Sequence, residues 1–150
     1  MYDTRVIALS REEAQSFRSM DPFVVISLTD TDAEHPRLEH QAALKDRLSL
    51  HFDDIYPENC IDAQGLPRLC EMKRDDAQHI AEFVRLWWGR VSTIVVHCHA
   101  GLSRSTGVAA AIRHHHGQDE RDLYETPRSP NQHCRALVTD ALRRAGIAKQ

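Results

Sequence analysis

The feature that most constrains this 150-residue chain is a short turn between an apolar run and a run of small residues, within positions 95–107. The stretch Thr93 to Val96 is β-branched and apolar, which is typical of a buried strand. From Ser105 onward, small and aliphatic residues predict a helix. The turn between them is tight, and Gly101 supplies the backbone freedom that such a turn needs. The segment therefore predicts a strand–turn–helix unit.

A turn of this kind can bind an anion. Its successive backbone N–H groups can point inward, and the N-terminus of the following helix adds positive potential. Arg104 can hold two phosphate oxygens with its planar guanidinium. Cys98 lies at the start of the turn, where the field that holds a dianion also favours a thiolate over a thiol. These residues predict a phosphate-binding loop with a cysteine nucleophile.

The same stretch resembles a known signature. His97, Cys98, Gly101, Arg104 and Ser105 fall on the positions of His-Cys-x5-Arg-Ser/Thr, the signature of the cysteine-based protein tyrosine phosphatase superfamily. Its Ala-Gly-x-Ser-Arg-Ser form is most similar to the compact dual-specificity and bacterial tyrosine phosphatase-like branches. The alternative interpretation, a buried cysteine at a strand end and a surface arginine, does not explain why the whole turn is small, polar and glycine-containing.

The resemblance implies a phosphomonoester hydrolase, a protein tyrosine or dual-specificity phosphatase that acts through a phosphocysteine intermediate. Cys98 would be the nucleophile, and the Ser105 hydroxyl would donate to its sulfur. The phosphate would be bound by the backbone of the turn and by the arginine, namely by His99, Ala100, Gly101, Leu102, Ser103 and Arg104. No metal and no cofactor is expected, because arginine and backbone dipoles supply the charge stabilisation.

The general acid is less well defined by the sequence. The stretch from Leu48 to Asp54 resembles the strand and exit that carry this acid in the family, with Asp54 on the acid's position. The interval from Asp54 to Cys98 is longer than in compact members, which indicates an enlarged loop after Asp54. Asp53, Asp75 and Asp76 therefore remain alternatives, although helix capping is the commoner use of the last two. A chain with no working acid is also left open.

Strand and helix signals alternate along the chain. Strands are expected at 6–9, 23–28, 48–52 and 93–96, and helices at 11–19, from Asp75 or Asp76 to 88, and from 105 to 116. Ser10 and Glu13 form a capping box for the first helix. Ser129 and Pro130 are expected to start the last helix as its N-cap and first residue. We expect one catalytic domain over 1–150, an α/β fold with a mostly parallel sheet of about four to five strands and helices on both faces.

Composition limits the partners. The chain is 41% hydrophobic and 27% charged, with a net charge of −3, which argues against nonspecific nucleic-acid binding. No apolar run approaches membrane-spanning length, and no signal-peptide pattern is present. The four cysteines, at positions 60, 70, 98 and 134, fit neither a disulfide framework nor zinc spacing, so we expect a reducing cytoplasm. Redox pairing of Cys60 or Cys70 with Cys98 is left open, with free thiols as the expectation.

The substrate is predicted only as a class. The variable positions of the turn are His99, Ala100, Leu102 and Ser103, and none is lysine or arginine. A phosphoinositide headgroup would favour such basic residues. We therefore expect a phosphotyrosine-containing protein or another phosphomonoester. The alternative is a catalytically weak or dead phosphate- or phosphoprotein-binding module on the same fold. An arsenate reductase or a sulfurtransferase fits less well, because of where the cysteine lies along the chain and because of Arg104.

Overall fold

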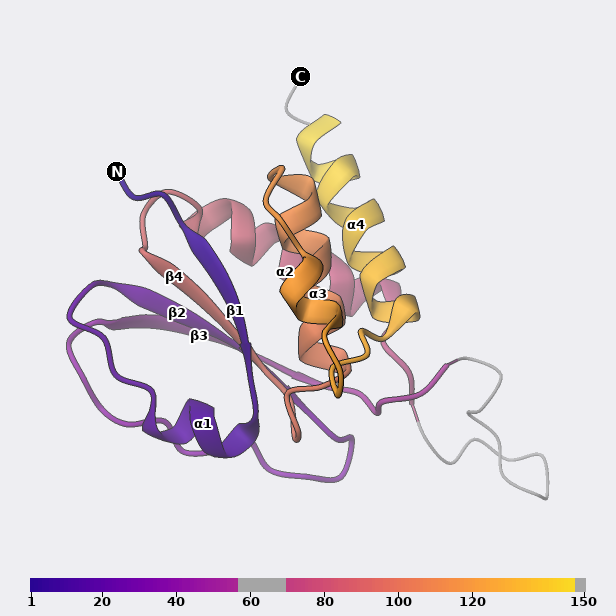
Figure 1. The fold of residues 1–150 in the computed structure, drawn as a ribbon, viewed down its shortest axis with the longest axis horizontal. Coiled ribbons are helices and arrows are strands. Elements are labelled where there is room, and N and C mark those ends of the chain that lie inside the picture. The colour runs from indigo at the N-terminus through magenta and orange to yellow at the C-terminus, as the bar shows by residue number, and fades with distance from the viewer. Residues whose placement is uncertain (57–69, 148–150) are drawn as a thin grey trace.

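The computed structural model describes residues 1–56 and 70–147, and its centre is a parallel β-sheet (Figure 1). The strands are β1 (Arg5–Leu9), β2 (Phe23–Thr29), β3 (Leu44–His51) and β4 (Thr93–His97). Their order in the sheet is β1-β4-β2-β3, and all three pairings are parallel. The described part of the chain thus confirms the predicted α/β class, with four strands and the signature strand β4 in the interior of the sheet.

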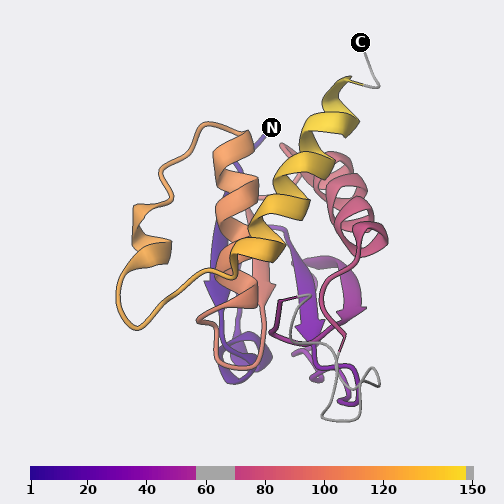
Figure 2. The ribbon, with the colours of Figure 1, turned by 90° about the vertical axis from the view of Figure 1, so that its right-hand side faces the viewer.

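Helices cover both faces of the sheet, unequally. They are α1 (Arg11–Ser16), α2 (Arg74–Trp87), α3 (Arg104–His115) and α4 (Gln132–Ile147), with a short 3₁₀ turn at Arg121–Tyr124. The last three helices pack together over one face and enclose the main core (Figures 1 and 2). On the other face a smaller apolar cluster joins Phe23, Val25 and Val95 with Phe17, which directly follows α1.

Burial explains why β2 and β4 are continuous apolar runs. Every residue of both strands is buried, because each lies between two neighbouring strands and under cover on both faces. Strand β3 lies at the sheet edge and is more exposed, and it begins at Leu44, four residues before the predicted start. The parallel arrangement brings the carboxyl ends of all four strands to one edge. Ser10, Asp30, Asp53 and Cys98 follow their strands at that edge.

The predicted helix starts are partly corrected. The capping box of Ser10 and Glu13 is present, although α1 ends at Ser16. Helix α2 begins at Arg74, so neither Asp75 nor Asp76 is its N-cap; Asp76 instead accepts the Lys73 backbone N–H at 2.9 Å from within the first turn.

The predicted start of the last helix is wrong. Helix α4 begins at Gln132, where Asn131 Oδ1 accepts the backbone N–H of Cys134 at 3.0 Å, which is the bond of an N-cap. Ser129 is not the cap: its backbone N–H donates to Leu102 O at 2.8 Å, and that of Asn131 donates to Ser103 O at 2.9 Å, so both residues are held against the signature turn. The helix therefore begins at Gln132, two residues after Pro130, the first helical residue that we predicted.

Candidate active site

Cys98 lies at the carboxyl end of β4 and is almost fully buried, with 3% of its surface exposed. Its backbone N–H donates to Leu9 O at 3.3 Å, which continues the pairing of β4 with β1. Its Sγ is 3.1 Å from Ser105 Oγ, within hydrogen-bonding distance for sulfur. The predicted nucleophile and the predicted hydroxyl donor are thus in contact.

The signature turn is held from outside by its carbonyl groups. His99 O accepts the Arg11 N–H at 3.0 Å, Leu102 O accepts from Ser129 at 2.8 Å, and Ser103 O accepts from Asn131 at 2.9 Å. Since the carbonyls point outward to these partners, the peptide N–H groups face the other way. Within residues 1–56 and 70–147, no acceptor is hydrogen-bonded to the amides of positions 99–104. They are available to an anion.

Gly101 allows the turn to approach the β1–α1 junction closely. Its φ is +75°, a conformation that residues with a side chain rarely adopt. A Cβ built at this position would be 2.6 Å from Ser10 N and 2.7 Å from Leu9 C. Both the backbone conformation and the close packing therefore require glycine here.

Helix α3 begins directly at the turn, with Ser103 at its N-cap position. The Ser103 side chain makes no capping bond to this helix; its hydroxyl donates to Asp54 Oδ1 at 2.7 Å. The first N–H groups of α3 therefore keep no side-chain cap, which leaves the positive end of the helix to a bound anion.

Arg104 is buried, and one nitrogen of its guanidinium, Nη1, makes its contacts with the described residues. Its Nη1 donates to Phe52 O at 2.8 Å and pairs with Asp30 Oδ1 at 2.8 Å. Its Nε is buried without a hydrogen-bond partner among the described residues. A buried N–H without a partner costs free energy, so its presence at the start of α3, directly after the signature turn, indicates a ligand-binding group.

Asp30 is a candidate site residue that our sequence analysis did not identify. The available signal was its position, since it directly follows a strand beside β4 and so lies at the edge where Cys98 emerges. Asp30 and Cys98 line the same small cavity of about 30 Å³, together with Arg11.

Of the acid candidates, the structure brings Asp54 to the turn. Asp54 Oδ1 accepts hydrogen bonds from Ser103 Oγ at 2.7 Å and from Asn131 Nδ2 at 2.9 Å. Its side chain is exposed, and no residue of the described ranges is bonded to Oδ2. Oδ1 thus acts as an acceptor while Oδ2 is free to carry and donate a proton.

Asp53 is instead bonded to residues outside the signature turn. It is buried and accepts hydrogen bonds from the backbone N–H of Cys70 at 2.8 Å and from Thr31 Oγ1 at 2.7 Å. Burial opposes ionisation of Asp53, but these bonds and the nearby Arg104 charge outweigh it, and the net pKa is lowered. An ionised carboxylate with its oxygens occupied is poorly suited to donate a proton.

Asp75 and Asp76 lie in the first turn of α2, where Asp76 is bonded to the Lys73 N–H. Burial raises the pKa of Asp76. No contact between these two residues and the turn is present in the described structure, so the geometry favours Asp54 over them.

The other cysteines have distinct surroundings. Cys70 is exposed and Cys134 is buried, and both are free thiols. Burial, followed by the charge of Asp54, raises the pKa of Cys134, which makes it an inert packing residue. Cys60 lies outside the described residues. Across the described ranges there is also no cluster of three histidine, cysteine or acidic side chains that could hold a metal ion.

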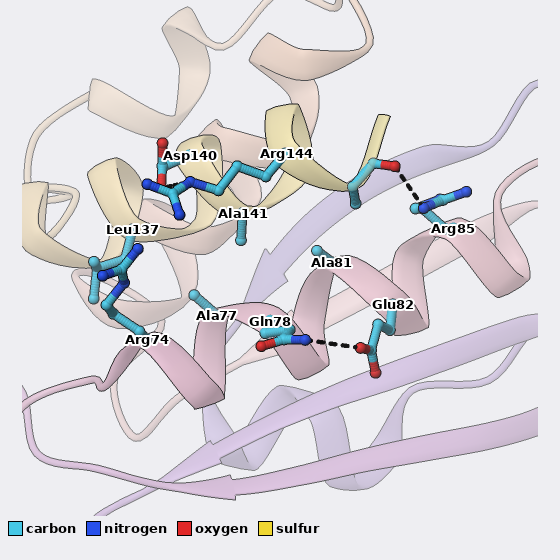
Figure 3. A pocket seen from close by; sticks show the side chains of 11 residues that line it. Arg74, Ala77, Gln78, Ala81, Glu82, Arg85, Leu137, Asp140, Ala141 and Arg144 are labelled. Carbon is cyan, nitrogen blue, oxygen red and sulfur yellow. Dashed lines mark hydrogen bonds and ion pairs between the residues drawn. The ribbon is translucent and has the colours of Figure 1, made fainter. Parts of the chain in front are cut away.

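A second concave surface lies away from the signature turn. A groove of about 400 Å³ runs between α2 and α4 (Figure 3). It is lined by four alanines and Leu137 together with three arginines, two acidic residues and Gln78, and none of its lining residues belongs to positions 97–106. No helix in the described part of the chain is long and apolar enough to span a membrane.

Comparisons with known proteins identify the fold. No protein-family model matches the chain, and no curated protein matches it either. The solved structure of the human tyrosine phosphatase-like serine/threonine/tyrosine-interacting protein is 19% identical, with a TM-score of 0.55 over 96% of this chain and 92% of that one. Human DUSP28 is 14% identical, with a TM-score of 0.58 over 97% and 95% of the two chains. PTPMT1 in complex with PI(5)P is 13% identical, with a TM-score of 0.52 over 97% and 95%. The chain has the fold of the compact cysteine-based protein tyrosine phosphatases.

Proposed function

We propose that residues 1–150 form a single catalytic domain, a cysteine-dependent phosphomonoester hydrolase of the protein tyrosine or dual-specificity phosphatase type. The observation that carries the proposal is the arrangement around Cys98. A buried sulfur lies at the start of a turn whose amides have no acceptor among the described residues. Arg104, at the end of that turn, is anchored at Nη1, and its Nε likewise has no partner there. This combination of N–H donors and a positive charge suits a phosphate dianion better than a neutral ligand.

In the proposed first step, the Cys98 thiolate attacks phosphorus in line with the leaving oxygen. Arg104 and the amides of positions 99–104 stabilise the equatorial oxygens as charge redistributes. Asp54 gives the proton on Oδ2 to the leaving phenolate or alkoxide. The S–P bond forms as the P–O bond breaks, which yields phosphocysteine, an alcohol or phenol, and an ionised Asp54.

In the second step, Asp54 accepts a proton from water as the water oxygen attacks phosphorus. The S–P bond breaks and inorganic phosphate is released. The Ser105 hydroxyl, 3.1 Å from Sγ, donates to the departing thiolate and stabilises it. Each step uses only residues of this chain and water, so we propose no metal and no cofactor.

The side chains of the turn favour a phosphoprotein substrate. Its variable positions, His99, Ala100, Leu102 and Ser103, carry no lysine or arginine. PTPMT1 has been crystallised with PI(5)P on the same fold, and a polyanionic headgroup of that kind would favour additional cations in the turn. We therefore propose phosphotyrosine, alone or with phosphoserine and phosphothreonine, in a reducing compartment such as the cytoplasm, where a thiolate persists.

The alternative is a phosphate- or phosphoprotein-binding module without turnover. The human tyrosine phosphatase-like serine/threonine/tyrosine-interacting protein shares the fold, and the anion-binding groups described above would serve binding alone. The two candidates differ in the need for Cys98 and Asp54, since a binding module needs only the amides and Arg104.

The deciding experiment is hydrolysis of p-nitrophenyl phosphate and of a phosphotyrosine peptide, with and without a chelator. We expect chelator-insensitive activity that Cys98→Ser abolishes, while binding of inorganic phosphate to this variant persists. Cys70→Ser is the matched control, because Cys70 is exposed, and it should retain full activity. Phosphate binding without hydrolysis in the wild type would favour the binding module. Activity lost to a chelator and restored by a divalent metal would contradict the thiolate mechanism.

A further inference from the structure

A chain of polar side chains, buried at Ser27 and His97 and half-buried at His35 and Arg47, lies on the sheet face of the smaller apolar cluster. His97 of β4 and Ser27 of β2 are register partners, and His97 Nε2 is 2.6 Å from Ser27 Oγ. Arg47 of β3 donates from Nη2 to the same oxygen at 3.2 Å. His35 Nδ1 lies 2.7 Å from it on a further side. One hydroxyl therefore joins two histidines and an arginine.

The contact of His97 with the Cys98 carbonyl oxygen sets the direction of these bonds. His97 Nδ1 lies 3.5 Å from the carbonyl oxygen of Cys98, which can only accept, so Nδ1 is the nitrogen that carries hydrogen. In a neutral ring Nε2 is then bare and accepts the Ser27 hydroxyl proton. Ser27 Oγ in turn accepts from Arg47 and from the Nδ1–H of His35, which also lies 3.1 Å from Thr29 Oγ1. In the opposite tautomer, the lone pair of His97 Nδ1 would face the lone pairs of the Cys98 carbonyl oxygen, which is unfavourable.

The surroundings keep His97 neutral, so its tautomer matters. Its side chain is 1% exposed, and burial lowers its pKa to about 4. The charged and titratable groups that face it come from three other elements: Arg47 from β3, His35 from the segment after β2, and Arg11 from α1, and each lowers the same pKa. A neutral imidazole can hold its proton on either nitrogen, and here the partner on Nε2 decides which.

We propose that Ser27 is a positioning residue for the Cys98 nucleophile, because it holds His97 in the tautomer and orientation that aim Nδ1–H at the Cys98 carbonyl. That N–H fixes the first peptide of the signature turn and places a positive dipole end beside the sulfur. The inference rests on the proposed function insofar as Cys98 is the nucleophile. Arg47 completes the arrangement, since its donation to Ser27 Oγ turns the hydroxyl proton toward His97.

The matched pair of variants is Ser27→Ala and Thr93→Val. Ser27→Ala removes only the bridging hydroxyl from a fully buried site. Thr93→Val removes another buried hydroxyl from the same face of β4, one that accepts Arg5 Nε and does not touch His97. Ser27→Thr keeps the hydroxyl and is the conservative rescue.

The first measurement is the tautomer of His97, which needs no substrate. Side-chain ¹⁵N NMR distinguishes a protonated from a bare ring nitrogen, and we expect the wild-type His97 to be neutral with hydrogen on Nδ1. In Ser27→Ala we expect a mixture of tautomers, with the wild-type pattern in Thr93→Val and Ser27→Thr. A wild-type ring with hydrogen on Nε2 would overturn the proposal even if the chain proves to be an active phosphatase.

The second measurement is the rate at which iodoacetate alkylates Cys98. Loss of an ordered dipole beside a thiolate disfavours ionisation, so we expect about a tenfold lower rate at pH 6 in Ser27→Ala. At pH 9, where thiols in general ionise, the rates should converge, which separates acidity from access. For hydrolysis at pH 6, kcat should fall with KM within twofold. Equal rates for Ser27→Ala and wild type at pH 6 would contradict the proposal.

Discussion

Ser103 Oγ donates a 2.7 Å hydrogen bond to Asp54 Oδ1, and this contact joins two segments 49 residues apart in the sequence. Ser103 belongs to the turn that surrounds Cys98, and Asp54 to the exit of β3. The bond leaves Oδ2 as the oxygen that can carry a proton, and it commits the Ser103 hydroxyl to Asp54 so that the first amides of α3 keep no cap. One contact thus places the proposed acid and leaves the anion site open.

We predict that Asp54→Asn lowers kcat strongly for phosphotyrosine peptides and much less for aryl phosphates with acidic leaving groups. An amide cannot donate the proton that a poor leaving group needs, whereas a good leaving group departs without it. The alkaline limb of the pH–rate profile, which reports the protonated acid, should flatten.

Asp75→Asn is the control for Asp54, because Asp75 is exposed in the first turn of α2 and should leave that limb in place. If the limb disappears in the Asp75 or Asp76 variant instead, the acid lies at the start of α2. If no aspartate variant changes it, the binding-module alternative gains support.

We predict that Arg104→Lys lowers kcat by roughly 10²-fold or more, the size observed when a transition-state donor is lost. Lysine keeps the positive charge but cannot donate to Phe52 O and to phosphate oxygens from one rigid plane. Steady-state kinetics measure the effect, and Arg121→Lys, at an exposed ion pair with Asp119, is the control. A change of only about twofold would place Arg104 outside the site.

We predict a smaller effect for Asp30→Asn. The Asp30 side chain is 48% exposed, so its pairing with Arg104 is screened by water and a loss of roughly two- to fivefold in kcat/KM is expected. Arg104 keeps its bond to Phe52 O in this variant. Asp32→Asn, in the same exposed segment, should have no effect. A loss as large as that of Arg104→Lys would show that Asp30 acts on the substrate directly.

We predict that folding stability decreases as the pH falls from about 6.5 toward 4. Burial lowers the pKa of His97 and of His116 to about 4, whereas both titrate near 6.5 when unfolded. In this window the unfolded chain binds more protons than the native one, so stability rises with pH. Urea midpoints at pH 7 and pH 5 measure the difference.

His116→Phe tests the same prediction by variant. His116 stacks on Trp88 with ring centroids 3.5 Å apart, and phenylalanine keeps a stacking ring without a titrating group. The drop in urea midpoint between pH 7 and pH 5 should become smaller. His79→Gln, at an exposed position of α2, should leave it unchanged. An unchanged drop in His116→Phe would contradict the assignment.

The strand–turn–helix unit could be predicted because every local signal there agrees. Apolar continuity marks β4, Gly101 marks the turn, and small residues mark α3. Local patterns left Asp53 as an alternative to Asp54, because the two are adjacent and chemically equal; only the resemblance favoured Asp54. The structure separates them through partners distant in the sequence, Ser103 for Asp54 and Thr31 with Cys70 for Asp53.

Other features depend on strand order, which local patterns do not contain. Asp30 looks like any acidic loop residue until β2 is known to lie beside β4. The start of α4 likewise depends on bonds from Ser129 and Asn131 to the signature turn, which compete with the capping signal of Ser129. In both cases tertiary contacts outweigh the local preference.

The hydrogen bonds between Asp53 and Cys70 have a consequence for how proteins of this fold can vary in length. Asp53 N donates to Cys70 O at 2.5 Å, and Cys70 N donates to Asp53 Oδ2 at 2.8 Å. These two hydrogen bonds hold the ends of the intervening segment together. Doubling the length of a flexible loop costs only about 0.6 kcal/mol in closure entropy. Evolution or an engineer can therefore change the number of residues between Tyr56 and Cys70 at a small cost in free energy, while Asp53, Asp54 and Cys70 keep their hydrogen bonds beside the proposed active site.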